Sequence, residues 1–123
     1  MPVGSSGSGK STSQMFPIDK GAIFNTAIAL NTDFFAADLE PTNTPTTFRI
    51  AFSCDAAGVL NVMREQLLPA PPATVTEHLN EGNDLAADCL YEFNVTVAEG
   101  QTINFQHSVG GTILSCTVVE IYG

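Results

Sequence analysis

Basic side chains are scarce in this sequence. The 123 residues hold 4 Lys and Arg against 13 Asp and Glu, which gives a formal net charge of -9 and an isoelectric point near 4.2. A nucleic-acid-binding face needs clustered basic side chains to displace the counterions of phosphates, and anionic membrane surfaces attract the same side chains. The composition therefore excludes an ordinary nucleic-acid-binding protein and disfavours a membrane surface, so neither is expected as a partner.

Charged residues of both signs are also few, at 14% of the chain against about 25% in a typical soluble domain. Apolar residues make up 44%, enough for a core in the single domain that this length allows. A folded domain with so few charges is expected to cover part of its surface with other chains. Trp is absent, so the chain lacks the ring on which sugar-binding surfaces most often rely.

Cysteine chemistry and targeting signals are equally sparse. Cys54, Cys89 and Cys116 are odd in number and widely spaced, which argues against a disulfide framework and a zinc site. Each lies among apolar residues, so all three are predicted to be small buried side chains. The chain shows neither a signal peptide nor the roughly 18 consecutive apolar residues of a spanning helix. We expect a protein made in the cytosol that stays there or leaves by a route other than general secretion.

The first 15 residues, MPVGSSGSGKSTSQM, are rich in Gly and Ser. Burial cannot offset the ordering entropy of such a segment, so we expect a flexible or extended arm over 1–20 and a folded domain over 21–123. Residues 4–11 (GSSGSGKS) also fit the phosphate-binding pattern G-x-x-x-x-G-K-[ST]. That loop needs a buried strand before it and a helix after it, and the nearby Pro17 would end any helix early. We interpret the match as accidental and predict no cofactor.

Alternation of apolar and polar residues dominates the chain beyond residue 47. In DCLYEFNVTVA every second residue from Cys89 to Val97 is apolar or aromatic, and from 102 to 108 the polar residues face away from their apolar neighbours. This period of two indicates strands, which Gly-containing turns separate. Strands are predicted at 48–54, 89–97, 102–108 and 113–122, with shorter ones at 22–30, 33–39, 58–64 and 74–79 and a turn at 80–84.

Helical periodicity is missing from every segment of twelve or more residues. Seven or eight short strands with one apolar face each must pack face to face to bury those faces. The predicted fold class is therefore all-β: an antiparallel β-sandwich, jelly-roll-like, with an extended N-terminal arm.

Isolated polar residues offer little catalytic chemistry. His78 and His107 have no partner at metal-ligand spacing and are interpreted as structural or surface residues. The acidic loop 80–88 has the oxygens that calcium prefers, but Asn and Asp are also common in turns, so a turn accounts for the same residues. Asn94 begins a glycosylation sequon that is idle without a secretion signal. A Ser-His-Asp triad has no G-x-S-x-G elbow to support it. We predict no catalytic residue and no metal site, and do not expect an enzyme.

Between Phe48 and Ile121 the spacing of predicted strands and turns follows a recognisable pattern. It is seen in the segments FRIAFSCDAAGVLNVMR, LNEGND (a turn), LYEFNVTVAEGQTINFQHS and the closing VVEI. In these segments the chain resembles small accessory structural proteins of tailed-phage particles, such as capsid decoration proteins. The resemblance implies a sandwich that self-associates, often as a trimer, on a capsid lattice, with an extended N-terminal arm lying on neighbouring subunits. It implies no catalytic residue.

The expected function is that of a virion structural protein, assembled in the host cytoplasm. Such a subunit would associate with itself and with a major capsid or other assembly protein, through the sandwich and through an arm or strand edge that adds to a neighbour's sheet. The candidate interaction residues are Phe16, Ile18, Ile23, Phe24 and Ile28.

Three alternatives remain at this level. Apolar residues on nominally outer faces, Leu90 and Val118 or Val119, favour the virion subunit, and the first alternative is a subunit of an extracellular filament that uses the same arm as a donor strand. A carbohydrate-binding module on a host surface is the second alternative. A nucleotide hydrolase acting through residues 4–11 is the third.

Overall fold

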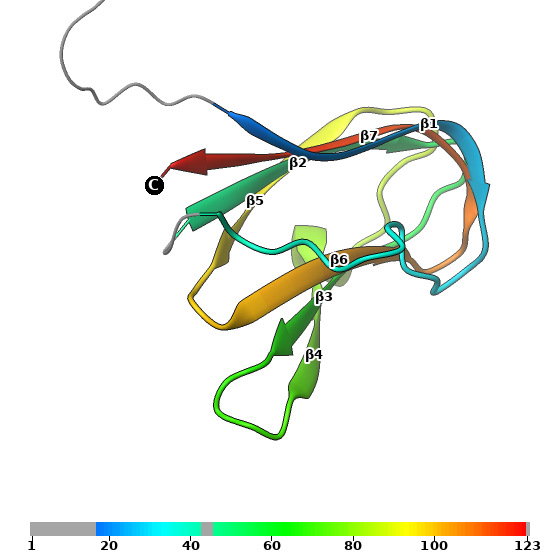
Figure 1. Ribbon diagram of the computed structural model, residues 1–123. Coiled ribbons are helices and arrows are strands. Elements are labelled where there is room, and N and C mark those ends of the chain that lie inside the picture. The colour runs from blue at the N-terminus through cyan, green and yellow to red at the C-terminus, as the bar shows by residue number, and fades with distance from the viewer. Residues whose placement is uncertain (1–16, 43–45, 123) are drawn as a thin grey trace, which may run out of the picture.

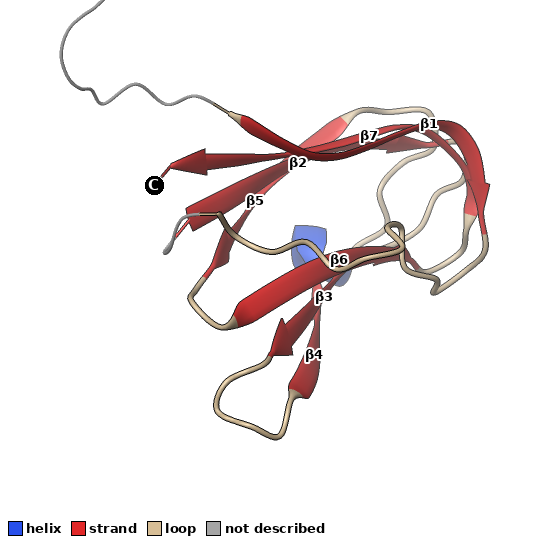
Figure 2. Ribbon diagram, viewed as in Figure 1, coloured by secondary structure: helices blue, strands red, loops and turns tan. Residues whose placement is uncertain are grey.

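The computed structural model describes residues 17–42 and 46–122, and these form strands and loops without an α-helix (Figure 1). One short 3-10 turn, η1, is the single helical element in this part of the chain (Figure 2). The elements are β1 (Ile18–Ile28), β2 (Thr46–Cys54), β3 (Leu60–Gln66), β4 (Ala73–His78), η1 (Leu79–Gly82), β5 (Tyr91–Val97), β6 (Gln101–His107) and β7 (Gly111–Tyr122).

The strands form two antiparallel sheets that enclose one core. A four-stranded sheet has the order β1-β7-β2-β5, and a three-stranded sheet has the order β4-β3-β6. The facing surfaces bury Phe48, Phe52 and Phe105 almost completely. Because each large apolar side chain stabilises the fold by about 1.5–3 kcal/mol when buried, these two faces hold the sandwich together. The other apolar residues of the core are Phe34, Leu39, Ile50, Cys54, Leu60, Val62, Leu85, Val95, Val97, Ile103, Ile113, Cys116 and Val118.

The predicted all-β sandwich is confirmed. The four strands with the clearest alternation, β2, β5, β6 and β7, begin and end within two residues of their predicted ranges. β3 and β4 also lie where short strands were predicted, and η1 forms the turn expected at 80–84. β1 begins at Ile18, so part of the arm expected over 1–20 is strand, while residues 1–16 lie outside the described residues.

The strand predicted at 33–39 is wrong. Only Leu39 forms a β-bridge, with Ile103 of β6, although the Phe34 backbone N–H also donates to the Phe105 carbonyl at 2.9 Å. The two buried side chains of the segment, Phe34 and Leu39, lie five residues apart instead of alternating, so the chain bends between them. The segment nevertheless lies along the free edge of β6, in the place of the eighth strand of a jelly roll.

This covering segment buries side chains that alternation places on an outer face. Thr102 is 5% exposed and Asn104 is 1% exposed. The Asn104 amide donates to the Phe35 carbonyl at 2.9 Å and to Asp38 Oδ1 at 3.0 Å, and its oxygen accepts from the Phe35 N–H at 3.2 Å. A polar side chain on β6 therefore fixes the segment that protects the edge of β6.

A buried ion pair closes the same side of the sandwich. Glu120 of β7 is 1% exposed and lies 3.2 Å from Lys20 Nζ of β1. The Thr42 backbone N–H donates to both Glu120 oxygens, at 2.9 and 3.0 Å, and Lys20 donates to the Thr42 hydroxyl at 2.6 Å. The pair thus ties the first strand, the last strand and the loop that leads into β2.

Candidate interaction surface

The two sides of the sandwich differ in how their strand edges are protected. On one side, a bulge between Asp19 and Gly21 and the left-handed Asn25 (φ 50°) interrupt the edge of β1. The segment 31–39 covers β6 on the same side, because a Cβ built on Gly21 would lie 2.5 Å from the Phe35 ring. Bulges and covering loops are the usual devices that prevent an edge from pairing with another chain. We call this side, formed by β1, β6 and the segment 31–39, the closed side.

The other side carries β4 and β5, which are the remaining sheet edges. Neither described ladder, β3 with β4 or β2 with β5, contains a register shift. Neither strand contains Pro or Lys. An edge strand presents a row of unpaired backbone N–H and C=O groups, which is a template for another strand. We call β4 and β5 together the open side.

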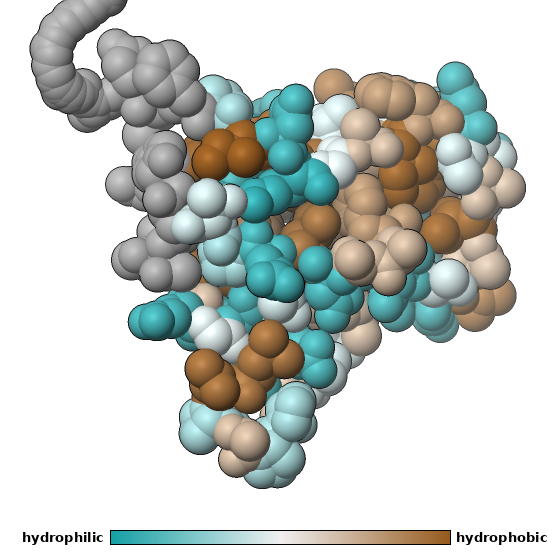
Figure 3. Space-filling view, in the orientation of Figure 1, coloured by the Kyte–Doolittle hydropathy of each residue, from teal (hydrophilic) through white to brown (hydrophobic). Residues whose placement is uncertain are grey.

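Four of the seven large apolar residues that are exposed in the described part of the chain lie on the open side. Leu68 and Val75 of the β3–β4 hairpin are 64% and 55% exposed, Leu67 is 38% exposed, and Leu90 before β5 is 65% exposed. The hairpin projects from the body of the sandwich in Figure 1, and hydrophobic surface is visible on it in Figure 3. The expected outward position of Leu90 is therefore confirmed; of the pair Val118 or Val119, Val118 is fully buried and Val119 is half-buried.

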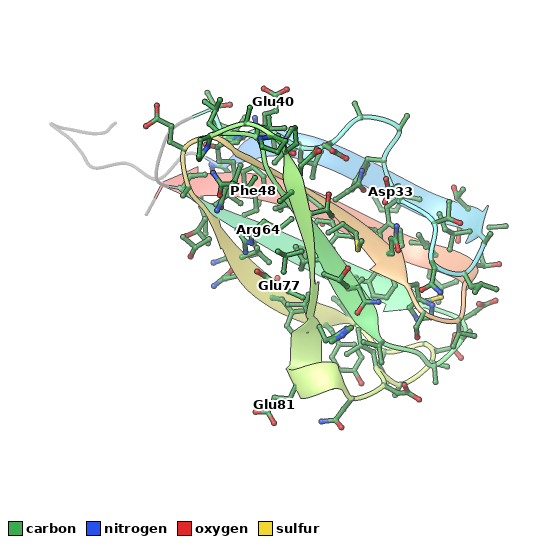
Figure 4. All side chains as sticks on the ribbon, turned by 90° about the horizontal axis from the view of Figure 1, so that it is seen from below. Asp33, Glu40, Phe48, Arg64, Glu77 and Glu81 are labelled. Atoms are coloured by element: carbon green, nitrogen blue, oxygen red, sulfur yellow. The ribbon has the colours of Figure 1, made fainter. Side chains whose placement is uncertain are left out.

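Arg64 fixes the β3–β4 hairpin to the rest of the sandwich. Its guanidinium binds Glu77 of β4 in a bidentate pair, at 2.8 and 3.0 Å, and donates to the Thr96 carbonyl of β5 at 2.7 Å and to Gln101 Oε1 of β6 at 3.0 Å. Arg64 and Glu77 lie close together in Figure 4. The Arg64 hydrogen bond and charge hold the pKa of Glu77 below its ordinary value. One side chain thus links four strands and neutralises the carboxylate on β4.

The sequence-based interaction residues are distributed differently. Phe16 lies outside the described residues. Ile23 and Ile28 are partly buried against the core, and Ile18 is half-buried in β1. Phe24 is 57% exposed and is the one described candidate that is free for contact. The structure does not bring these residues together with the open side, since β1 belongs to the closed side.

His107 is the polar residue most enclosed by the core. Its ring has no exposed surface, lies 5.7 Å from the Phe52 ring centre, and accepts a hydrogen bond from the Gly110 N–H at Nδ1, at 2.9 Å. This bond assigns the ring proton to Nε2, which has no hydrogen-bond partner among the described residues. Burial lowers the pKa of His107 from 6.5, against smaller opposing effects of Gly110 and Asp84. His107 is therefore a neutral core residue, in line with its interpretation as structural.

Acid should weaken the fold through His107. Below about pH 6.5 His107 is protonated in the unfolded chain but stays neutral in the folded protein. The stabilisation of the folded state by neutral His107 is therefore complete above that pH and declines below it. The free energy of unfolding should fall by up to about 1.4 kcal/mol per pH unit until the lowered pKa is reached. Urea unfolding at several pH values measures this slope. His107→Gln should abolish it, whereas His78→Gln, the same change at an exposed strand end, should keep it. Equal slopes in both variants would contradict the assignment.

The other polar candidates lie apart. Among residues 17–42 and 46–122, no three His, Cys, Asp or Glu side chains gather as metal ligands. Asn80 and Glu81 instead adopt left-handed turn conformations in η1 (φ 54° and 56°). Asn94 is exposed on β5. The phosphate-binding pattern at 4–11 lies outside the described residues.

The cysteine prediction holds at two positions. Cys54 and Cys116 are buried, but Cys89 is exposed, so its predicted burial is wrong. The reason is that β5 begins only at Tyr91, and the left-handed Asp88 (φ 62°) turns the chain just before Cys89. Among the described residues no helix is long and apolar enough to cross a bilayer.

Sequence reasoning missed the two residues that shape the open side, Arg64 and Val75. A signal was present for both. TVTEH has the polarity of an exposed strand, and Arg64 lies at the same parity as the buried Leu60 and Val62 of its own strand. An arginine on an inward face needs acceptors nearby, which marks it as a structural link.

Comparison with known proteins adds no further assignment. No protein-family model matches this chain, and no curated protein matches it significantly.

Proposed function

We propose that this chain is a structural subunit of a tailed-phage particle, of the capsid decoration or accessory kind, assembled in the host cytoplasm. In this role it associates with copies of itself and with a major capsid or other assembly protein, and it performs no catalysis.

One observation carries the proposal: the sandwich is protected against strand pairing on one side and left open on the other. On the closed side, a bulge, a covering segment and a buried ion pair protect the strand edges. Two regular, unprotected edges with exposed Leu and Val side chains then fit a surface that other chains cover. Jelly rolls build many viral capsid and lectin domains, although a fold does not by itself determine a function.

A subunit of an extracellular filament is the second candidate. The free edges of β4 and β5 suit the acceptance of a donated strand. In that case residues 1–16 of one copy would supply the strand, and truncated chains would lose all association.

Sedimentation of the full chain tests the proposal. Between roughly 1 and 200 µM the average mass should rise above the 13.0 kDa of one chain, because a lattice subunit with small individual contacts associates in a concentration-dependent way. The matched variant lacks residues 1–16 and not 1–20, since Lys20 is needed for the pair with Glu120. A chain that stays monomeric over this range, with and without the arm, would count against a structural subunit.

A further inference from the structure

β4 is the most accessible free edge in the described part of the molecule. Five of its six residues are exposed, and Glu77 is half-buried beside Arg64. The strand belongs to the hairpin that projects from the body of the sandwich (Figure 1), so a partner can approach it without meeting the other sheet. Its unpaired backbone groups offer a template for a partner strand.

We propose that β4 pairs antiparallel with β4 of a second copy, about a two-fold axis at Val75, and joins the two β4-β3-β6 sheets into one. This inference rests on the proposed function, because it names the contact through which the subunit self-associates.

The alternation of backbone groups along a strand restricts the registers in which β4 can pair with its own copy. Alternate residues of an edge strand point their N–H and C=O groups toward the free edge, and opposed residues must match in this respect. A strand that pairs with its own copy therefore opposes residues of equal parity, and the axis passes through a residue. With the axis at Val75, Val75 opposes its copy, Thr74 opposes Thr76, and Ala73 opposes Glu77.

The charges of β4 fit this self-pairing. Glu77 is the single charged residue of the strand apart from the titratable His78, and Arg64 neutralises it at 2.8 and 3.0 Å. In the Val75 register the two glutamates do not oppose each other, so no like charges meet across the ladder. For a chain with a net charge of -9, a nearly neutral strip is a place where two copies can approach with little repulsion.

The side chains fit as well. Val75 is 55% exposed on the face that points toward β5, as its register opposite Arg64 shows. Pairing places two valines side by side, a combination that stabilises cross-strand contacts. Antiparallel pairing also brings the apolar hairpin tip of each copy, with Leu67 and Leu68, next to the η1 end of the other.

Disulfide trapping in the full chain tests the register. Opposed residues have Cα atoms about 4.5–5.5 Å apart, within the range that a disulfide bridges, whereas residue 74 and its own copy would be diagonal neighbours at about 7–8 Å. We expect the variant Val75→Cys with Cys89→Ser to form a covalent dimer under mild oxidation at least about tenfold faster than the matched variant Thr74→Cys with Cys89→Ser. The native Cys54 and Cys116 are buried, and burial raises the pKa of the Cys116 thiol to about 12, so neither competes.

A second variant measures association without a new covalent bond. Val75→Lys sets two ammonium groups against each other at the axis and should weaken the concentration-dependent mass increase by at least about tenfold, while Leu30→Lys, at a residue that is 59% exposed in the turn after β1, should not. If the chain associates but Val75→Cys fails to cross-link, or Val75→Lys associates normally, the β4 contact is refuted and the proposed function stands. If the unmodified chain never associates, both fail.

Discussion

Lys20→Met is expected to lower the free energy of unfolding by about 3 kcal/mol, which is the typical result of removing one partner from a buried ion pair. Glu120 is 1% exposed, and its oxygens are held by Lys20 and by the Thr42 N–H. Without the ammonium group, the Glu120 carboxylate stays on the closed side of the sandwich without its ion-pair partner Lys20. The folded state must then keep it charged at high cost or protonate it.

The arrangement provides two controls for this measurement. Arg49→Met removes the same charge from an exposed residue that contacts Asn94, and it should change stability by no more than about 0.5 kcal/mol. The double variant Lys20→Met with Glu120→Leu should recover much of the loss, since apolar residues can replace a buried pair at little cost. Urea denaturation of the four proteins completes the comparison. A Lys20→Met variant as stable as Arg49→Met would show that the pair contributes nothing.

The parts of this fold that alternation determines could be predicted from the sequence. In β5 every second side chain from Tyr91 to Val97 lies on the inward face, because each successive Cβ points to the opposite side of a strand. The same rule places His107 in the core. These predictions need only local geometry, so they hold without knowledge of how the sheets are arranged.

What the sequence could not provide depends on which segment covers which face. Asn104 looks solvent-facing by alternation, yet it is buried because residues 31–39 pass over β6. Phe34 and Leu39 anchor that segment without any periodicity that identifies it in advance. Glu120 shares the parity of the buried Cys116 and Val118, so its inward position could be predicted. Its partner Lys20 could not, because it is 100 residues away and no local pattern connects the two.

The open side could not be predicted from the sequence for a related reason. Whether a strand lies at an edge, and whether another segment covers that edge, depends on its neighbours in space, which the topology sets. The N-terminal candidates Ile23 and Ile28 lie in the segment 22–30, for which the sequence predicts only a short strand. In the structure they pack against the core from β1, whereas Leu67, Leu68 and Val75 of the β3–β4 hairpin are exposed.

Arg64→Met should produce the second large effect, a loss of about 2–3 kcal/mol, because it removes charge-assisted hydrogen bonds while keeping an apolar stem of similar length. The change leaves Glu77, the Thr96 carbonyl and Gln101 Oε1 without their common donor. Since Arg64 fixes β4 to β5 and β6, the β3–β4 hairpin should open before the rest of the sandwich. Hydrogen exchange would then show faster exchange of the β3 and β4 amides with little change in β7. Uniformly faster exchange would contradict the local role.

The acid dependence of the same pair separates charge from packing. Arg64 lowers the folded pKa of Glu77 from 4.5, so the stabilisation is complete above that value and is lost as the pH falls through the lowered pKa. Arg64→Met and Glu77→Gln should both remove this part of the acid dependence, whereas Arg64→Lys should retain some of it without the bidentate geometry. Unfolding experiments between about pH 5 and about pH 2 measure the difference. If Glu77→Gln leaves the acid dependence unchanged, the charge of Glu77 is not what holds the hairpin, and the open side owes its shape to the neutral contacts of Arg64 alone.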